Sequence, residues 1–252
     1  MIILDGGMGR ELLRSGAPFR QPEWSALALI EAPGFVARAH RAFAAAGAEV
    51  LTTNSYALVP FHIGQKRFDS DGRMLADRAG RLARGVAAEG AAEGAAKGRA
   101  RVAGSLPPAF GSYRPDLVDA DLAQPILRTL IAGLAPHVDL WLAETLSAAA
   151  EAEAVRRALG NDPRPLWLSF TLADDGRQPA RLRSGESVAV AAARAEALGA
   201  AALLFNCSQP EVMEAAVRMA RQALPPGMAI GVYANAFTPM PADAEANSGL
   251  SE

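Results

Sequence analysis

The stretch AALLFNCSQPEVMEAAVRMARQAL, residues 201–224, contains one complete unit of the expected fold. A short apolar run comes first, and a polar corner with the chain's only cysteine, Cys207, follows it. A helical pattern then begins at Ser208, a candidate N-cap, with Pro210 in the first turn and Glu211 at capping-box spacing. The pattern predicts a buried strand that leads directly into a helix.

The same order, an apolar run and then a helical pattern, recurs along the chain. Seven apolar runs are strand candidates: residues 1–5, 48–54, 100–106, 138–145, 165–170, 201–206 and 228–235. Four amphipathic stretches are helix candidates: 33–47, 146–160 with Ser147 as N-cap, 184–199 with Ser184 as N-cap, and 208–224. The runs are almost continuously apolar, which is typical of parallel strands covered on both faces. The alternation favours an α/β fold of the (β/α)8 TIM barrel type over an open doubly wound sheet.

A closed barrel of this type needs eight strands, one more than the candidates supply. The Ala/Gly-rich segment 85–101 is expected to be a helix end that runs into a solvated linker, and residues 236–252 show no apolar periodicity. Either an eighth strand is present without a recognisable apolar run, or the last β/α unit is missing from this chain. The second explanation is favoured. The sequence therefore predicts a single barrel domain over residues 1–252 that is incomplete at its C-terminal end.

Composition limits the classes of partner. The formal net charge of −2 gives no electrostatic reason to expect a nucleic acid or an anionic membrane. One cysteine excludes an intramolecular disulfide framework and fits a reducing compartment. The N-terminus lacks a signal-peptide pattern, and no uncharged apolar run reaches the roughly 18 residues of a membrane span. We expect a cytoplasmic protein that binds small molecules, and leave a homo-oligomer open.

Polar residues gather at the carboxyl ends of the predicted strands, where the catalytic groups of β/α barrels lie. In chain order, the candidates are Asp5, Gly6, Gly7, Thr53, Asn54, Glu144, Asn206, Cys207 and Asn235. Several have a structural alternative. Asp5 before two glycines could be a turn residue, and Thr53 and Asn54 could satisfy loop backbone. Cys207 could pack as a small apolar side chain. Glu144 ends an apolar strand, where a carboxylate without a partner is costly, so a functional role is favoured.

These residues resemble the homocysteine S-methyltransferase family, which includes betaine-dependent and S-methylmethionine-dependent enzymes and the homocysteine module of methionine synthase. The matching stretches occur in family order over almost the whole chain. They are LDGGMGREL (4–12), TTNSY (52–56), GSLPP through Tyr113 (104–113), AET (143–145), FNC (205–207) and YANA (233–236).

The resemblance implies a barrel that binds zinc through three cysteines, of which Cys207 is the first. The other two belong to a Gly-Gly-Cys-Cys motif on the last strand, and this sequence has no such motif. The resemblance also implies that Asp5 and Glu144 hold the amino group of homocysteine. The full expected substrate-binding set is Asp5, Gly6, Gly7, Thr53, Asn54, Glu144, Asn206 and Asn235, the last as an oxygen donor near the metal.

The implied activity is zinc-dependent methyl transfer from a small donor, with S-methylmethionine or S-adenosylmethionine favoured, to the thiol of L-homocysteine, giving methionine. Zinc would deprotonate the substrate thiol, so no side chain is expected to act as a catalytic residue. One alternative is a non-catalytic relative that binds an amino acid or a partner chain without tight zinc. Another is an unrelated barrel enzyme that uses Asp5 and Glu144 as an acid/base pair, against which the FNC and TTNSY matches count.

Overall fold

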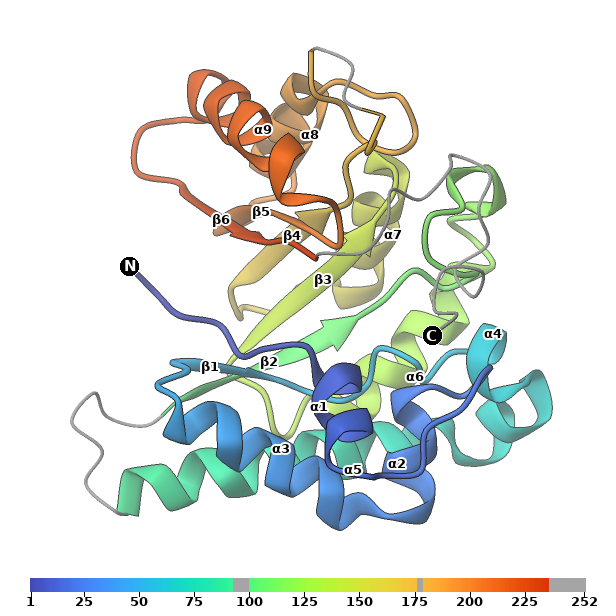
Figure 1. Cartoon of the computed structure of the whole chain (residues 1–252). Helices are drawn as coiled ribbons and strands as arrows, with labels where there is room; N and C mark the ends of the chain where they lie inside the picture. The colour runs from blue at the N-terminus through green and yellow to red at the C-terminus, as the bar shows by residue number, and fades with distance from the viewer. Residues whose placement is uncertain (93–99, 176–178, 236–252) are drawn as a thin grey trace. The chain divides into compact units, whose positions relative to one another are not determined.

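The computed structural model describes residues 1–92, 100–175 and 179–235 (Figure 1). The expected linker beyond residue 92 and the tail 236–252 lie outside the described residues. The chain divides into two compact units. The first consists of Met1–Leu106 and Ile126–Trp141, and the second of Pro107–Pro125 and Leu142–Glu252.

The first unit contains two parallel strands and most of the helices of the N-terminal half. β1 pairs with β2 so that Val50 lies opposite Arg101 and Thr52 opposite Ala103. The elements are α1 (Met8–Arg14), α2 (Ser25–Glu31), α3 (Pro33–Ala45), β1 (Val50–Thr52), α4 (Pro60–Ile63), α5 (Gln65–Ala92), β2 (Arg101–Leu106), most of α6 (Ala123–Leu134) and the first two residues of β3 (Leu140–Leu146).

The N-terminal segment runs beside β1 without forming a strand. Leu4 makes a single parallel bridge to Val50, flanked by hydrogen bonds from Asp5 N to Val50 O and from Glu49 N to Ile3 O. Ile3 and the two residues before it are exposed, so little apolar burial holds this segment in a longer ladder. The strand predicted over residues 1–5 is therefore wrong in extent, although the parallel direction is correct.

In the core of the first unit, two glycines allow neighbouring elements to pack closely. An added Cβ at Gly133 of α6 would lie 2.5 Å from the Arg73 carbonyl oxygen and 2.6 Å from the Ala76 Cβ on α5. On β2, a Cβ at Gly104 would lie 2.8 Å from the ring of the buried Trp141. Both glycines are therefore required by packing rather than by backbone conformation.

The second unit contains the rest of β3 and three further parallel strands. β4 pairs with β5 and β5 with β6, with Phe170 opposite Phe205 and Asn206 opposite Tyr233. All five residues of β4 and of β5 are buried, as expected for strands covered on both faces. Besides β3 the elements are η1 (Pro115–Leu117), α7 (Ala149–Leu159), β4 (Leu166–Phe170), α8 (Val188–Ala197), β5 (Ala202–Asn206), α9 (Pro210–Ala223) and β6 (Ala229–Tyr233).

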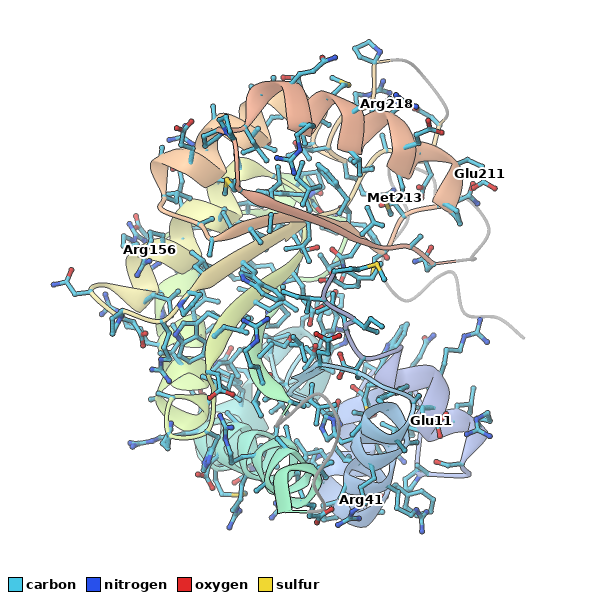
Figure 2. The ribbon with its side chains drawn as sticks, turned by 90° about the vertical axis from the view of Figure 1, so that its left-hand side faces the viewer. Glu11, Arg41, Arg156, Glu211, Met213 and Arg218 are labelled. Atoms are coloured by element: carbon cyan, nitrogen blue, oxygen red, sulfur yellow. The ribbon has the colours of Figure 1, made fainter. Side chains whose placement is uncertain are left out.

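The helix α9 shows how the quoted stretch folds. Met213 on its inner face is buried, whereas Glu211 and Arg218 lie on the outer face in solvent (Figure 2). α8 and α9 pack side by side over β5, and α9 also contacts β6 (Figure 1). The predicted unit of buried strand, polar corner and amphipathic helix is confirmed.

Three predicted N-caps are wrong, because each helix begins after a different residue from the predicted serine. α8 is capped by Ser187, whose hydroxyl accepts from Val190 N, and not by Ser184. α9 begins after Gln209, and the Ser208 hydroxyl instead accepts from Leu172 N at 2.8 Å. α7 begins after Ala148, so Ser147 lies outside it.

Between β4 and α8, the described segments 171–175 and 179–187 pair antiparallel, and we call this pair of arms the hairpin. Leu172 pairs with Leu182, Ala173 N donates to Arg181 O, and Arg183 N donates to Thr171 O. The two arms therefore meet at a fixed register directly after the carboxyl end of β4.

Six parallel strands follow one another in chain order among the described residues, from β1 to β6. This order confirms the α/β class, while the eight-unit barrel and the single domain over 1–252 stay predictions. In the part of the chain that the structure describes, no helix is both long and apolar enough to cross a membrane.

Candidate active site

The predicted site residues fall into both compact units. Those of the first unit are Asp5, Gly6, Gly7, Thr53 and Asn54, and those of the second are Glu144, Asn206, Cys207 and Asn235.

In the first unit, Asp5 is held against β1 by its side chain. One carboxylate oxygen accepts from Thr52 N at 2.7 Å, and the other accepts from the Thr52 hydroxyl at 2.8 Å. Gly6 leaves room for the ring of Phe43, which a Cβ would approach to 2.7 Å. Gly7 is the N-cap residue of α1. Asp5 is thus fixed at a strand end rather than in a free turn.

Thr53 and Asn54 belong to a buried polar corner after β1. The Thr53 hydroxyl accepts from Ser105 N at 3.0 Å and shares a hydrogen bond with the Ser55 hydroxyl. The Asn54 amide nitrogen donates to Ser25 O at 3.0 Å. These groups satisfy loop and strand backbone, which was the structural alternative for both residues. Their contact with a substrate stays a prediction.

In the second unit, Asn206 joins the carboxyl ends of three strands. Its side-chain oxygen accepts from Thr145 N at 3.0 Å and from the Ser169 hydroxyl at 2.8 Å. Its side-chain nitrogen donates to the Thr145 hydroxyl oxygen at 2.9 Å. The residue is fully buried. Asn206 therefore holds the end of β3, through Thr145, and the end of β4, through Ser169. Direct binding of substrate by Asn206 stays a prediction.

Cys207 lies at the centre of this network. Its sulfur accepts from the Thr145 hydroxyl at 3.8 Å, and its carbonyl oxygen accepts from the Tyr113 hydroxyl at 3.2 Å. Burial, with a smaller contribution from the nearby Glu144 carboxylate, raises the pKa of the thiol to about 11. The thiol is consequently protonated at neutral pH unless a cation binds it.

Three residues of this network have left-handed backbone although they are not glycine. The φ angles are 64° for Tyr113, 62° for Thr145 and 49° for Cys207. L-residues avoid this region because the Cβ crowds the following carbonyl oxygen. Such strain persists where the surroundings impose it and gathers at functional sites.

Glu144 is partly buried at the end of β3 and accepts a hydrogen bond from the Tyr233 hydroxyl at 3.1 Å. Burial, together with the Glu144 carboxylate, raises the pKa of Tyr233 well above its ordinary value, so the hydroxyl stays a donor. Asn235 lies two residues beyond the end of β6, and its backbone N donates to Ser208 O at 3.1 Å. This bond ties Asn235 to the residue that follows Cys207 in the chain.

Two charged residues of this unit were not among the predicted site residues. Asp174 and Arg183 lie on opposite arms of the hairpin after β4 and form an ion pair at 2.9 Å. The Arg183 guanidinium also covers the ring of Tyr113 at 4.6 Å from its centre. The turn residues in ADDG (173–176) were the available signal for a hairpin, but nothing in the residue pattern indicated the pairing.

The zinc implied by the resemblance requires about three protein ligands in a catalytic site. Among the described residues, no cluster of three or more His, Cys, Asp or Glu side chains could hold a metal ion. Cys207 is the one thiol of the chain, and Glu144 is engaged by Tyr233. These residues do not fit a complete zinc site, so no chemical step is assigned to zinc.

The six parallel strands in chain order, with polar residues at their carboxyl ends, define an α/β protein built of β/α units. Residues 2–249 match the sequence model of the family described as Homocysteine S-methyltransferase. The chain belongs to this family.

Curated relatives and a solved structure agree with this assignment. The chain is 30% identical over 185 residues to the homocysteine S-methyltransferase of Escherichia coli K12, covering 69% of this chain and 59% of the relative. It is 28% identical over 238 residues to homocysteine S-methyltransferase 1 of Brassica oleracea var. italica, covering 86% and 71% respectively. The metallated form of the homocysteine methyltransferase MmuM from Escherichia coli superposes with a TM-score of 0.81 at 27% identity, covering 95% of this chain and 93% of that one.

Proposed function

We propose that this chain transfers a methyl group from a small donor, S-methylmethionine or S-adenosylmethionine, to the thiol of L-homocysteine, giving methionine. Family membership supports the reaction class. The observation that carries the proposal is the hydrogen-bonded network of Thr145, Asn206 and Cys207 at the ends of β3 and β5, with Glu144 next to Thr145 on β3.

The carboxylates suit the ammonium group of the amino acid. Glu144 is partly buried and already accepts one hydrogen bond, from Tyr233, and an ionised carboxylate can accept several more. Asp5 provides a second carboxylate in the first unit. We assign both to the substrate ammonium, because charge-assisted hydrogen bonds are the stronger ones. The remaining proposed substrate-binding residues are Gly6, Gly7, Thr53, Asn54, Asn206 and Asn235.

The chemistry is a displacement at the methyl carbon. A bond forms between the homocysteine sulfur and the methyl group as the donor's sulfonium–methyl bond breaks, and the donor leaves as a neutral thioether. The thiol proton passes to solvent. A thiol is a poor nucleophile until it is deprotonated, and holding sulfur and methyl in line supplies a large part of the rate enhancement. Binding, orientation and exclusion of water are the tasks proposed for the residues of this chain.

We propose Cys207 as the residue of this chain that contacts zinc where the metal is bound. Because this chain offers a single thiolate, we expect weak zinc binding and slow turnover by the 252 residues alone. The chain spans 59% of the Escherichia coli relative's length and 71% of the Brassica relative's.

Methionine formation tests the proposal directly. The chain is incubated with L-homocysteine and with S-methylmethionine, S-adenosylmethionine, betaine or a methylfolate in turn, with and without added zinc, and methionine is measured by mass spectrometry. Methionine above the uncatalysed rate with a sulfonium donor is expected. No methionine from any donor, with the chain folded, would overturn the proposal. Homocysteine binding by calorimetry without turnover would instead favour the non-catalytic relative.

A pair of carboxylate variants locates the site. Glu144→Gln keeps the shape but removes the charge, so kcat/KM for homocysteine should fall about tenfold to a hundredfold, the range for a hydrogen bond to a charged group. Glu153→Gln is the matched control. Glu153 lies on α7 in the same unit, half exposed, and forms an ion pair with Arg194, so its loss should leave kcat/KM unchanged.

A further inference from the structure

The hairpin after β4 buries an ion pair close to the predicted site. Arg183 donates through Nη2 to an oxygen of Asp174 at 2.9 Å, and the side chains are only 2% and 4% exposed. Burying two charges carries a large desolvation penalty, so such a pair is weak evidence for stability by itself. Its further contacts indicate what else the pair does.

Both members of the pair connect to the turn that contains Cys207. The second carboxylate oxygen of Asp174 accepts from Gln209 N at 3.0 Å. The Arg183 guanidinium covers the ring of Tyr113, whose hydroxyl donates to the Cys207 carbonyl oxygen at 3.2 Å. The contacts therefore close a ring that holds the turn on both sides of Ser208.

The turn needs such support because its backbone is strained. Cys207 and Tyr113 both have φ in the left-handed region, at 49° and 64°. Without restraint, a non-glycine residue would relax to a more favourable conformation. The hydrogen bond to the Cys207 carbonyl and the hydrogen bond at Gln209 N act on the two ends of the segment that would have to move.

We propose that Arg183, Asp174 and Tyr113 form a positioning cluster that fixes the orientation of Cys207 at the end of β5. The significance of Cys207 in methyl transfer rests on the proposed function, whereas the restraint itself rests on the contacts described here. None of the three residues is proposed to touch the reacting atoms. They act on the thiol through the backbone of residues 207–209.

Alkylation of the thiol by iodoacetamide measures the restraint. Because the chain has one cysteine, a mass increase of the intact protein reports on Cys207 alone. Tyr113→Phe removes only the hydroxyl and should accelerate alkylation about fivefold, which corresponds to one hydrogen bond of typical net strength. Arg183→Met should accelerate it by at least about tenfold, because it removes the cation over Tyr113 and leaves Asp174 buried without its partner. Arg183→Lys keeps the positive charge beside Asp174 but loses the planar guanidinium over Tyr113, so it should restore the native rate only in part.

Two controls separate local release from general destabilisation. Arg194→Met removes a half-exposed ion pair of the same unit and should leave the rate unchanged. Rates are also measured at low urea concentrations, because local release does not depend on urea there, whereas access through global unfolding accelerates with it. Native rates in both Tyr113→Phe and Arg183→Met, or acceleration that depends on urea, would overturn the proposal. If Arg183→Met does not fold, Tyr113→Phe decides alone.

Methyl transfer provides the second measurement. In Tyr113→Phe, kcat/KM for homocysteine should fall about fivefold while the melting temperature falls by no more than about 2–4 °C. Faster alkylation with an unchanged kcat/KM would overturn the positioning role in catalysis. A wild-type chain that transfers no methyl group would remove the proposed function, and the alkylation rates would still test the restraint on Cys207.

Discussion

Acidification should destabilise the first unit through one histidine, His40. This residue lies on α3 and is fully buried, and among the described residues neither of its ring nitrogens has a hydrogen-bond partner. Burial lowers the pKa of the imidazole from 6.5 to about 4, because the charged form would lose its hydration without gaining a partner.

The sign and size of the effect follow from proton linkage. The unfolded chain, with its histidine pKa near 6.5, takes up a proton before the folded chain does, so stability falls as the pH drops through 6.5 and levels off below about 4. At 1.36 kcal/mol per pKa unit, the full loss is about 3 kcal/mol, and about 2 kcal/mol of it is present at pH 5. No correction for solvent screening applies, because the side chain is inaccessible.

The variant His40→Leu removes the titrating group and fills a similar volume. Urea denaturation followed by circular dichroism at pH 8, 7, 6 and 5 gives the free energy of unfolding of both proteins. Between pH 8 and pH 5, the wild type should lose about 2 kcal/mol more than the variant. Val36→Ala, a cavity at a fully buried position of the same helix, is the control, and it should lower stability equally at every pH. Equal pH dependence in the wild type and His40→Leu would refute the reasoning.

Three further predictions concern other parts of the chain. Burial raises the pKa of Glu151 from 4.5 to about 7, so the folded chain binds the proton more tightly than the unfolded chain. As the pH rises from 5 to 8, the free energy of unfolding of the wild type should fall by about 2 kcal/mol relative to that of Glu151→Gln. An equal pH dependence of both proteins in urea denaturation would contradict this. Gly133→Ala should destabilise the protein by about 1–3 kcal/mol, because its Cβ would meet the backbone of α5. Gly85→Ala has open space around the new Cβ on α5 and should stabilise the protein by about 0.5–1 kcal/mol. Thermal melts of the two variants and the wild type measure these changes. Dialysed protein should hold far less than one zinc ion per chain by plasma mass spectrometry, and a stoichiometric tight ion that Cys207→Ser removes would show that one thiol suffices.

Strand positions could be predicted from sequence because buried parallel strands are short apolar runs. The predicted ranges 165–170 and 201–206 differ from β4 and β5 by one residue at most. No helix was predicted over most of α5, where charged residues, alanine and glycine obscure the apolar face. The predicted strand at 1–5 does not form because its first three residues are exposed and only Leu4 bridges to Val50.

The positions of Glu144 and Cys207 at the carboxyl ends of strands could be predicted from sequence, whereas their binding roles stay predictions. The environment of these residues could not be predicted, because hydrogen-bond partners come from segments far away in sequence. Asn206 was expected at a substrate, but its amide is hydrogen-bonded to Thr145 of β3 and Ser169 of β4. Asp174 and Arg183 are nine positions apart on a hairpin, a spacing that neither helical nor strand periodicity detects.

The three left-handed residues of the second unit have a consequence for how such a protein evolves. Tyr113, Thr145 and Cys207 each give up roughly 1 kcal/mol that glycine at the same position would recover. A lineage selected only to fold should therefore drift toward glycine or asparagine at these three positions. A lineage that retains tyrosine, threonine and cysteine at these positions keeps a lower folding stability. Retention of these three residues would therefore indicate selection for activity.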